Sequence, residues 1–291
     1  MAICQDRVVI ITGAGGGLGR AYAHAFADTG AKVVVNDINL EAAEAVVAQI
    51  RDNGGDAVAD SHDITNYEQS AEIVKETVAR YGALHAVVNN AGICRDRMFA
   101  SLGESDWDAV IAVHLKGHFC ITSHAVQYWR AQSKAGNAVS GRIINTSSGA
   151  GLQGSIGQSN YAAAKGGIAS LTLVQAAELA RYGITANALA PAARTGMTEE
   201  VFADMMSAKE GAFDYYAPEN VAPLVVWLAS DASAHISGKV FEVEGGKLSI
   251  ADGWRKGPEQ DKGDRWLPEE IGAAVDSLVE QAEPAQKVYG S

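Results

Sequence analysis

The chain has 291 residues, of which 47% are hydrophobic, and its 35 acidic and 23 basic residues give a net charge of −12. That charge opposes phosphate backbones and anionic lipid surfaces, so we expect neither a nucleic acid nor a membrane as a partner. Three scattered cysteines without a CxxC pair predict no disulfide framework and no zinc site, and no apolar run reaches the roughly 18 to 20 residues that span a bilayer. We therefore expect a large globular domain in the cytoplasm.

Short apolar runs alternate with alanine-rich segments along most of the chain. The runs predicted as strands are 8–11, 32–36, 57–60, 85–89, 141–145, 185–189 and 239–243. The segments predicted as helices are 18–29, 40–53, 66–81, 104–130, 160–182 and 218–230. Continuous apolar strands separated by helices predict an α/β fold of the Rossmann type, a doubly wound parallel sheet with helices on both faces. The loops that follow the strands then meet at one edge of the sheet.

The composition changes at Ser249, where charged residues, Gly, Pro and Trp become frequent. We therefore predict a domain over residues 1–248 and a C-terminal extension over 249–291, with an amphipathic helix at 268–281. The extension is expected to pack on the domain or on a neighbouring subunit. A partly disordered terminus is the alternative.

A glycine-rich loop, TGAGGGLG from Thr12 to Gly19, lies between the first strand and the first helix. The spacing of Gly13, Gly17 and Gly19 is typical of a loop that turns tightly, admits a pyrophosphate close to its backbone and directs a helix N-terminus at it. Asp37 ends the second strand eighteen residues later. A carboxylate there accepts hydrogen bonds from the adenosine ribose and repels a 2′-phosphate, so NAD is the predicted cofactor.

Tyr161 and Lys165 lie four residues apart in a predicted helix, so their side chains share one face. A phenol has a pKa of about 10, and a neighbouring cation stabilises its phenolate. Ser148, thirteen residues before Tyr161, supplies a hydroxyl that can polarise a reacting oxygen. We predict Tyr161 as general base for alcohol oxidation, Lys165 as the group that adjusts its pKa, and Ser148 as the polarising donor.

An Asn-Asn-Ala-Gly run at 89–92 follows the fourth predicted strand. With this run, the glycine loop, Asp37 and the Ser, Tyr and Lys set, the chain resembles the short-chain dehydrogenase/reductase family over about residues 5–247. The resemblance implies an oxidoreductase that forms a homodimer or homotetramer through helices 104–130 and 160–182. It also implies cofactor contacts from Gly13, Gly17, Leu18, Gly19, Asp37, Asp63, Ile64, Asn90, Ala91, Gly92, Tyr161, Lys165, Ala193 and Thr195.

His114, in the segment AVHLKGHF, stands where many family members have an asparagine that holds a water for proton exchange. In this feature the chain is similar to a narrower group, the (3R)-hydroxyacyl-CoA dehydrogenase domains of peroxisomal multifunctional enzyme type 2, also called 17β-hydroxysteroid dehydrogenase type 4. His114 either supports the water chain as a further catalytic residue or is a satisfied core histidine. His118 lies one turn later, but the pair lacks a third ligand, so no metal is predicted.

The segment 196–216 is predicted to cover the active site, and its apolar residues suit a bulky hydrophobic substrate. These residues are Met197, Val201, Phe202, Met205, Met206 and Phe213. The predicted function is NAD-dependent interconversion of a secondary alcohol and a ketone, first on a hydroxysteroid and alternatively on a (3R)-3-hydroxyacyl-CoA. A non-catalytic protein that senses the dinucleotide is the more remote alternative.

Overall fold

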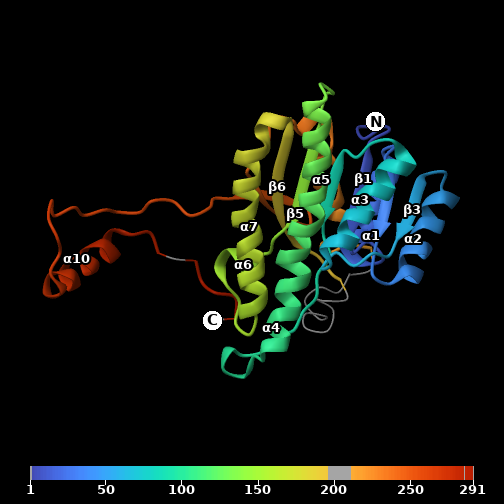
Figure 1. Cartoon of the computed structure of the whole chain (residues 1–291). Helices are drawn as coiled ribbons and strands as arrows, with labels where there is room; N and C mark the ends of the chain where they lie inside the picture. The colour runs from blue at the N-terminus through green and yellow to red at the C-terminus, as the bar shows by residue number, and fades with distance from the viewer. Residues whose placement is uncertain (1, 196–210, 285, 291) are drawn as a thin grey trace.

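The computed structural model describes residues 2–195, 211–284 and 286–290. Within these residues, eight strands form one sheet in the order β3-β2-β1-β4-β5-β6-β7-β8. The strands from β1 to β7 are parallel, and β8 is antiparallel to β7. Their bounds are β1 Val8–Thr12, β2 Lys32–Asn36, β3 Asp56–Asp60, β4 Ala86–Asn89, β5 Gly141–Thr146, β6 Ile184–Ala192, β7 Val240–Glu244 and β8 Lys247–Ala251. The predicted doubly wound α/β fold is confirmed (Figure 1).

Helices cover both faces of this sheet. Helices α1, α2 and α9 pack on one face, and α3, α5 and α7 pack on the other (Figure 1). The α-helices in the described residues are α1 Gly17–Asp28, α2 Leu40–Asp52, α3 Tyr67–Tyr81, α4 Glu104–Ile111, α5 Gly117–Lys134, α6 Gly149–Gln153, α7 Ser159–Leu179, α9 Ala222–Ala229 and α10 Pro268–Gln281. Short 3₁₀ turns occur at Phe99–Ser101, Ala180–Tyr182, Pro218–Asn220 and Asp231–Ser233.

The apolar strands fill two cores because successive side chains of a strand point to opposite faces. In β1, Val9 and Ile11 belong to the core that includes Phe26 of α1. Ile10, between them, belongs to the core that includes Ile121 of α5. All five residues of β1 are buried. A strand with both faces covered needs apolar residues at every position, which explains the continuous runs in the sequence.

The predicted helix 104–130 is interrupted. Helix α4 ends at Ile111, a π turn spans Ala112–Lys116, and α5 then runs from Gly117 to Lys134. A π turn carries one extra residue per turn, so it rotates the side chains that follow it relative to a regular helix. His114 lies inside this turn and is 1% exposed. The interruption therefore directs a polar ring into the interior.

The chain continues past the predicted boundary at residue 248 as an edge strand. β8 pairs with β7 from Lys247 to Ala251, a strand that the apolar pattern did not predict. The predicted helix 268–281 is confirmed as α10, which lies away from the sheet, and the chain then returns to end near α6 and α7 (Figure 1). No helix in the described ranges is both long and apolar enough to cross a membrane.

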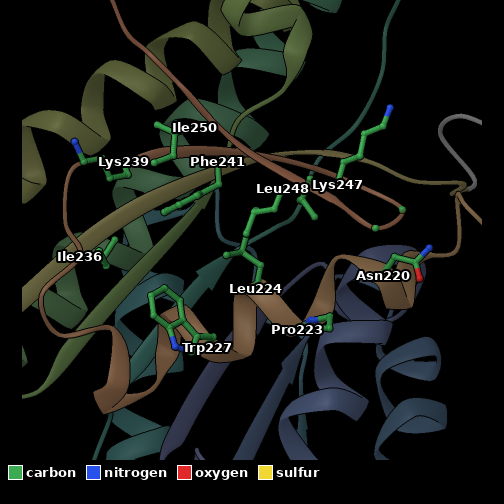
Figure 2. Close-up of a pocket in the computed structure, with 13 residues that line it drawn as sticks. Asn220, Pro223, Leu224, Trp227, Ile236, Lys239, Phe241, Lys247, Leu248 and Ile250 are labelled. Carbon is green, nitrogen blue, oxygen red and sulfur yellow. The ribbon is translucent and has the colours of Figure 1, made fainter.

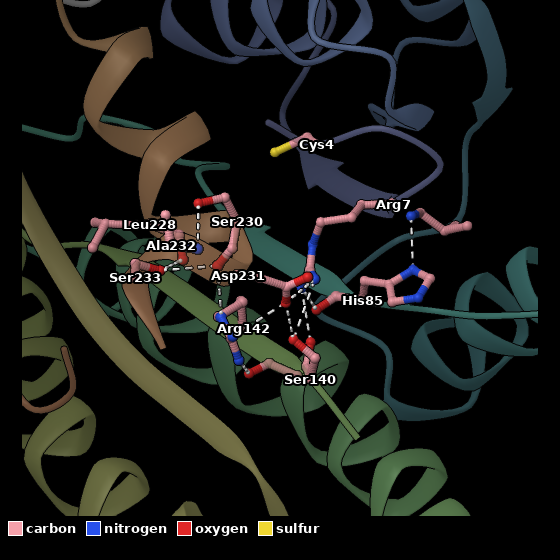
Figure 3. Close-up of polar contacts among 12 residues, drawn as sticks. Cys4, Arg7, His85, Ser140, Arg142, Leu228, Ser230, Asp231, Ala232 and Ser233 are labelled. Atoms are coloured by element: carbon pink, nitrogen blue, oxygen red, sulfur yellow. Dashed lines mark hydrogen bonds and ion pairs between the residues drawn. The ribbon is translucent and has the colours of Figure 1, made fainter. Parts of the chain in front are cut away.

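Two buried arginines share one carboxylate at the edge of the sheet where β1 and β5 begin (Figure 3). Asp231 Oδ1 lies 2.7 Å from a guanidinium nitrogen of Arg7 and 3.5 Å from one of Arg142. Ser140 donates to the same oxygen at 2.5 Å, and this bond is the largest cause of the lowered pKa of Asp231. Burial lowers the pKa of both arginines. This cluster joins β1, β5 and the end of α9.

Candidate active site

Ser148 and Tyr161 meet at the edge of the sheet where β5 ends. Ser148 is the N-cap of α6, and its hydroxyl accepts a hydrogen bond from Ala150 N at 3.2 Å. Tyr161 lies in the first turn of α7, and the Ser148 side chain is close enough to lower the pKa of its phenol. The predicted serine and tyrosine are thus neighbours, as a shared substrate oxygen would require.

Burial, rather than a nearby charge, dominates the pKa of Tyr161. Burial raises this pKa to about 12, and the hydrogen bond with Ser148 lowers it by less. The sequence predicted that Lys165 lowers the pKa of the phenol, but its charge is not among the causes of the shift. Burial explains this absence, because Lys165, with a pKa of about 7, loses its charge before a phenol with a pKa of about 12 ionises. The Lys165 amine lies 5.5 Å from the centre of the ring and donates to the Thr146 carbonyl oxygen at 2.7 Å.

Lys165 is itself perturbed. It is 2% exposed, and burial lowers its pKa to about 7. Ser147, the neighbour of Ser148, donates its hydroxyl to the Lys165 carbonyl oxygen at 2.8 Å and is buried. Ser147 therefore fastens β5 to α7, which leaves Ser148 as the hydroxyl beside Tyr161.

His114 holds the loop that follows β4. Its Nε2 lies 3.0 Å from the Ile93 amide nitrogen and 2.8 Å from the Ile93 carbonyl oxygen. Its ring meets the ring of Tyr161 edge to face, with the centres 5.1 Å apart. Burial, followed by the charge of Lys165, lowers the pKa of His114 to about 3. A side chain at Gly92 would collide with the imidazole, since a Cβ there would lie 2.4 Å from Cε1.

His118 does not join His114 as a metal ligand in the described structure. His118 Nε2 accepts from the Thr146 amide at 3.3 Å, next to the carbonyl that Lys165 binds. Burial places the pKa of His118 well below its usual value. Among the described residues, the acidic and histidine side chains close enough together to hold an ion are Asp60, His62 and Glu76. Neither His114 nor His118 belongs to this group.

A buried amide network supports these residues, and the sequence patterns did not predict it. Asn89 Nδ2 donates to Thr122 Oγ1 and to Asn145 Oδ1, both at 2.9 Å. Asn145 Nδ2 then donates to Thr172 Oγ1 and Gln175 Oε1, again at 2.9 Å. The network links β4 and β5 to α5 and α7. The only sequence signal was an asparagine near the end of each of two adjacent apolar strands.

The glycine loop has the shape of a phosphate cradle. Gly13 has φ +63°, and a Cβ at Gly19 would lie 2.2 Å from the Gly13 carbonyl oxygen. Helix α1 begins at Gly17 after Gly16, which offers no capping side chain, so its first amides are open to an anion. Thr195 lies beside Gly17, at 3.4 Å from a Cβ built there. These residues fit the pyrophosphate of a dinucleotide.

Three polar residues hold this cradle in position. Asp37 accepts from the Gly15 amide at 2.9 Å through Oδ2 and from the Asn39 amide at 3.0 Å through Oδ1. Asn90 Nδ2 donates to the carbonyl oxygens of Thr12 and Gly13, both at 3.0 Å. The Thr12 hydroxyl accepts a hydrogen bond from the backbone N–H of Asn90 at 3.0 Å. The sequence did not suggest this role for Thr12.

The remaining predicted cofactor residues lie at the same edge. Asp63 and Ile64 follow β3, and Asp63 Oδ1 accepts from the Thr65 amide at 2.7 Å. Ala91 N donates to Thr12 Oγ1, and Leu18 packs against the core beside α1. Ala193 is 4% exposed just after β6.

Most of the predicted active-site cover, 196–210, lies outside the described residues, and its remaining apolar residue Phe213 is 65% exposed. A separate apolar pocket of about 570 Å³ lies between α9, β7 and β8, lined by residues that include Leu224, Trp227, Phe241 and Ile250 (Figure 2). Its lining contains none of Ser148, Tyr161 and Lys165, so it is distinct from the candidate active site.

A parallel sheet with a glycine loop after β1 and a Ser, Tyr and Lys set after β5 defines a nucleotide-dependent dehydrogenase. The chain matches the short chain dehydrogenase family over residues 7–206. It belongs to this family, whose members typically use nicotinamide dinucleotides.

Several relatives share most of the chain. The hydroxyacyl-CoA dehydrogenase ChsB1 of Mycobacterium tuberculosis is 43% identical over 97% of this chain and 91% of its own length. Mouse peroxisomal multifunctional enzyme type 2 is 43% identical over 83% of this chain, which matches 32% of that longer protein. A solved short chain dehydrogenase from Mycobacterium avium is 56% identical, with a TM-score of 0.92 over 99% of this chain and all of its own. The predicted similarity to the hydroxyacyl-CoA dehydrogenase group is confirmed.

Proposed function

We propose that this protein is an NAD-dependent dehydrogenase that interconverts 3-hydroxyacyl-CoA and 3-oxoacyl-CoA thioesters. The observation that carries the choice of substrate is the 43% identity to a hydroxyacyl-CoA dehydrogenase along nearly the whole of both chains. The sequence favoured a hydroxysteroid narrowly, because the net charge of −12 disfavours the phosphates of CoA. The hydroxysteroid therefore becomes the comparison substrate.

In the proposed reaction, Tyr161 takes the proton of the substrate alcohol while the carbinol carbon loses a hydride. A bound nicotinamide dinucleotide supplies the hydride acceptor. The Ser148 hydroxyl, which neighbours the Tyr161 phenol, donates to the oxygen that becomes the ketone. Because burial keeps the phenol protonated, its role as a base requires stabilisation of the phenolate, which the Ser148 hydroxyl supplies in part. The Lys165 ammonium, 5.5 Å from the centre of the ring, would add to it when charged. In the reverse direction, Tyr161 returns the proton.

We assign NAD rather than NADP as the cofactor. Asp37 presents a carboxylate at the end of β2, next to the glycine loop. A 2′-phosphate beside this carboxylate would suffer charge repulsion, whereas ribose hydroxyls can donate to it. The Asp37 carboxylate also keeps the loop closed through the Gly15 amide, which supports a fixed pyrophosphate cradle.

We assign His114 a positioning role through the Ile93 backbone, and a homodimer or homotetramer built on α5 and α7. Phe119 on α5 is 51% exposed, and Leu173 and Val174 on α7 are 50% and 49% exposed. Exposed apolar side chains on two long helices favour burial against a second copy, which light scattering would measure. A cytoplasmic location agrees with three cysteines that are all free.

Steady-state assays test the proposal. NADH formation is measured with both stereoisomers of 3-hydroxydecanoyl-CoA and with estradiol, each with NAD and with NADP. We expect turnover of one hydroxyacyl-CoA isomer with NAD, and its loss by at least about a thousandfold in Tyr161→Phe with NADH binding retained. Tyr182→Phe, after the other end of α7, is the matched control.

Turnover of estradiol alone would favour the hydroxysteroid. Turnover of neither substrate, with intact NADH binding, would favour the non-catalytic alternative.

A further inference from the structure

The end of the chain runs beside the loop that joins Ser148 to Tyr161. Tyr289 forms a parallel bridge with Ser155. The Ile156 amide donates to the Tyr289 carbonyl oxygen at 2.9 Å, and the Tyr289 amide donates to the Gly154 carbonyl oxygen at 3.2 Å. We call residues 287–290 the C-terminal strap. It adds a short strand to the segment between the two predicted catalytic hydroxyls.

The side chain of Tyr289 packs against the residue that follows Ser148. A Cβ built on Gly149 would lie 2.7 Å from the Tyr289 hydroxyl oxygen and 2.9 Å from its Cε2. Such contacts are too close for a Cβ, so a larger residue at 149 would make the phenol ring shift. The Tyr289 ring contacts Gly149, and the Cα atoms of Gly149 and Ser148 are about 3.8 Å apart. The ring therefore lies beside the backbone that carries Ser148.

Three half-exposed apolar side chains gather at this contact. Ile156 is 49% exposed, Val288 is 41% exposed and Tyr289 is 49% exposed. A Cβ built on Gly154 would lie 3.4 Å from Val288 Cγ1. A Cβ built on Gly290 would lie 3.5 Å from the Cβ of Ile156. Side chains left half exposed next to a reactive hydroxyl can still bury apolar surface against a substrate.

Charges of both signs lie near Tyr289. After burial, the carboxylates of Glu242 and Glu244 in β7 contribute to the raised pKa of the Tyr289 phenol, and a hydrogen bond with Gln153 opposes them. Carboxylates repel the phosphates of CoA and leave an uncharged alkyl chain unaffected. Lys247 lies 3.2 Å from Glu244, and Lys287 belongs to the strap, so these cations offset the carboxylates. The apolar side chains of Ile156, Val288 and Tyr289 are what fit the strap to the acyl end of the thioester.

We propose that Tyr289 is a specificity-determining residue that contacts the acyl chain of the substrate, and that the strap holds the loop at 154–156 in position for it. The inference rests on the proposed oxidation of 3-hydroxyacyl-CoA. The contact between the strap and the loop at 154–156 does not depend on the identity of the substrate.

Kinetics with substrates of two lengths test the specificity. We expect Tyr289→Ala to raise KM for 3-hydroxydecanoyl-CoA about tenfold and to change KM for 3-hydroxybutyryl-CoA less than about twofold, because only the longer chain reaches the ring. Tyr289→Phe keeps the ring and should restore the preference for the longer substrate. Gly149→Ala displaces the same ring from the other side and should resemble Tyr289→Ala. Val279→Ala, on the exposed face of α10, is the control.

The specificity role would be overturned if Tyr289→Ala changed KM equally for the two substrates. It would also be overturned if Tyr289→Ala kept the wild-type preference for the longer substrate. The supporting contact is tested without any substrate, by amide hydrogen exchange at Ile156 in the full chain and in a variant that ends at residue 286. Faster exchange in the shortened variant is expected, and equal exchange would overturn the strap. If the wild type oxidises no hydroxyacyl-CoA, the proposed function and the specificity role both fail, while the exchange measurement still decides the contact.

Discussion

Replacing Lys165 with methionine is expected to stabilise the protein while abolishing turnover. Lys165 is 2% exposed, and burial lowers its pKa from 10.5 to about 7. A difference of about 3.5 units corresponds to roughly 5 kcal/mol of cost for keeping the ammonium charged inside the folded chain. Methionine removes that cost and gives up the hydrogen bond to the Thr146 carbonyl, worth about 1 kcal/mol. The expected net gain is about 4 kcal/mol below pH 7.

The gain should depend on pH with a definite sign. Because the pKa of Lys165 is lower in the folded than in the unfolded chain, the unfolded chain binds more protons between pH 7 and 10.5. Wild-type stability from this residue therefore rises across that window and is lowest below pH 7. The advantage of Lys165→Met should shrink from about 4 kcal/mol at pH 6.5 to below about 1 kcal/mol near pH 10.

Urea unfolding of both proteins, at one protein concentration and a series of pH values, measures the difference, in which titrating groups that do not interact with Lys165 cancel. His114, whose pKa the charge of Lys165 lowers to about 3 together with burial, titrates well below the lowest pH used. Lys134→Met, at the exposed end of α5, is the control and should show no such dependence. An advantage that stays constant from pH 6.5 to 10, or a variant that is less stable throughout, would refute the assignment of a destabilising buried cation.

Three further substitutions test separate parts of the molecule. Asp37→Asn should lower the ratio of kcat/KM for NAD to that for NADP by roughly 10- to 100-fold, and an unchanged ratio would argue against its contact with the ribose. Asp231→Asn removes the charge that Arg7 and Arg142 share, and because the Asp231 side chain is 76% exposed it should cost about 1 kcal/mol in urea unfolding, with a smaller loss in Asp231→Glu. Because the pKa of His114 is about 3, His114→Asn should leave the shape of the pH–rate profile between pH 5 and 9 unchanged, and the disappearance of an ionisation there would contradict a neutral positioning role.

Much of the fold followed from local patterns. Continuous apolar strands predicted a sheet covered on both faces, and the structure bears this out in β1, where Ile10 faces one core and its neighbours the other. Asn66 caps α3, and Gly82 ends it with φ +77°, as the positions of these residue types favour. The π turn was not predicted, because a single turn with i→i+5 hydrogen bonds is too short to change the spacing of apolar residues along the sequence. β8 escaped because pairing at an edge depends on β7 rather than on its own sequence.

The candidate site was predictable in its members and less so in its electrostatics. Ser148 and Tyr161 are neighbours because both follow β5, one at the start of α6 and the other in the first turn of α7. The opposing pKa changes of Tyr161 and Lys165 arise from burial, which spacing along a helix cannot report. The contact of Tyr289 with Gly149 joins residues 140 positions apart, and no local pattern indicates it.

The two ends of the chain tolerate additions differently. The N-terminus leads through Arg7 to the sheet edge opposite the site, whereas Tyr289, near the C-terminus, lies against the residue after Ser148 (Figure 1). An affinity tag fused to the C-terminus would therefore extend directly from the strap and compete with its bonds to the loop. A tag on the N-terminus would avoid this contact, so activities measured with the two tag positions should not be treated as interchangeable.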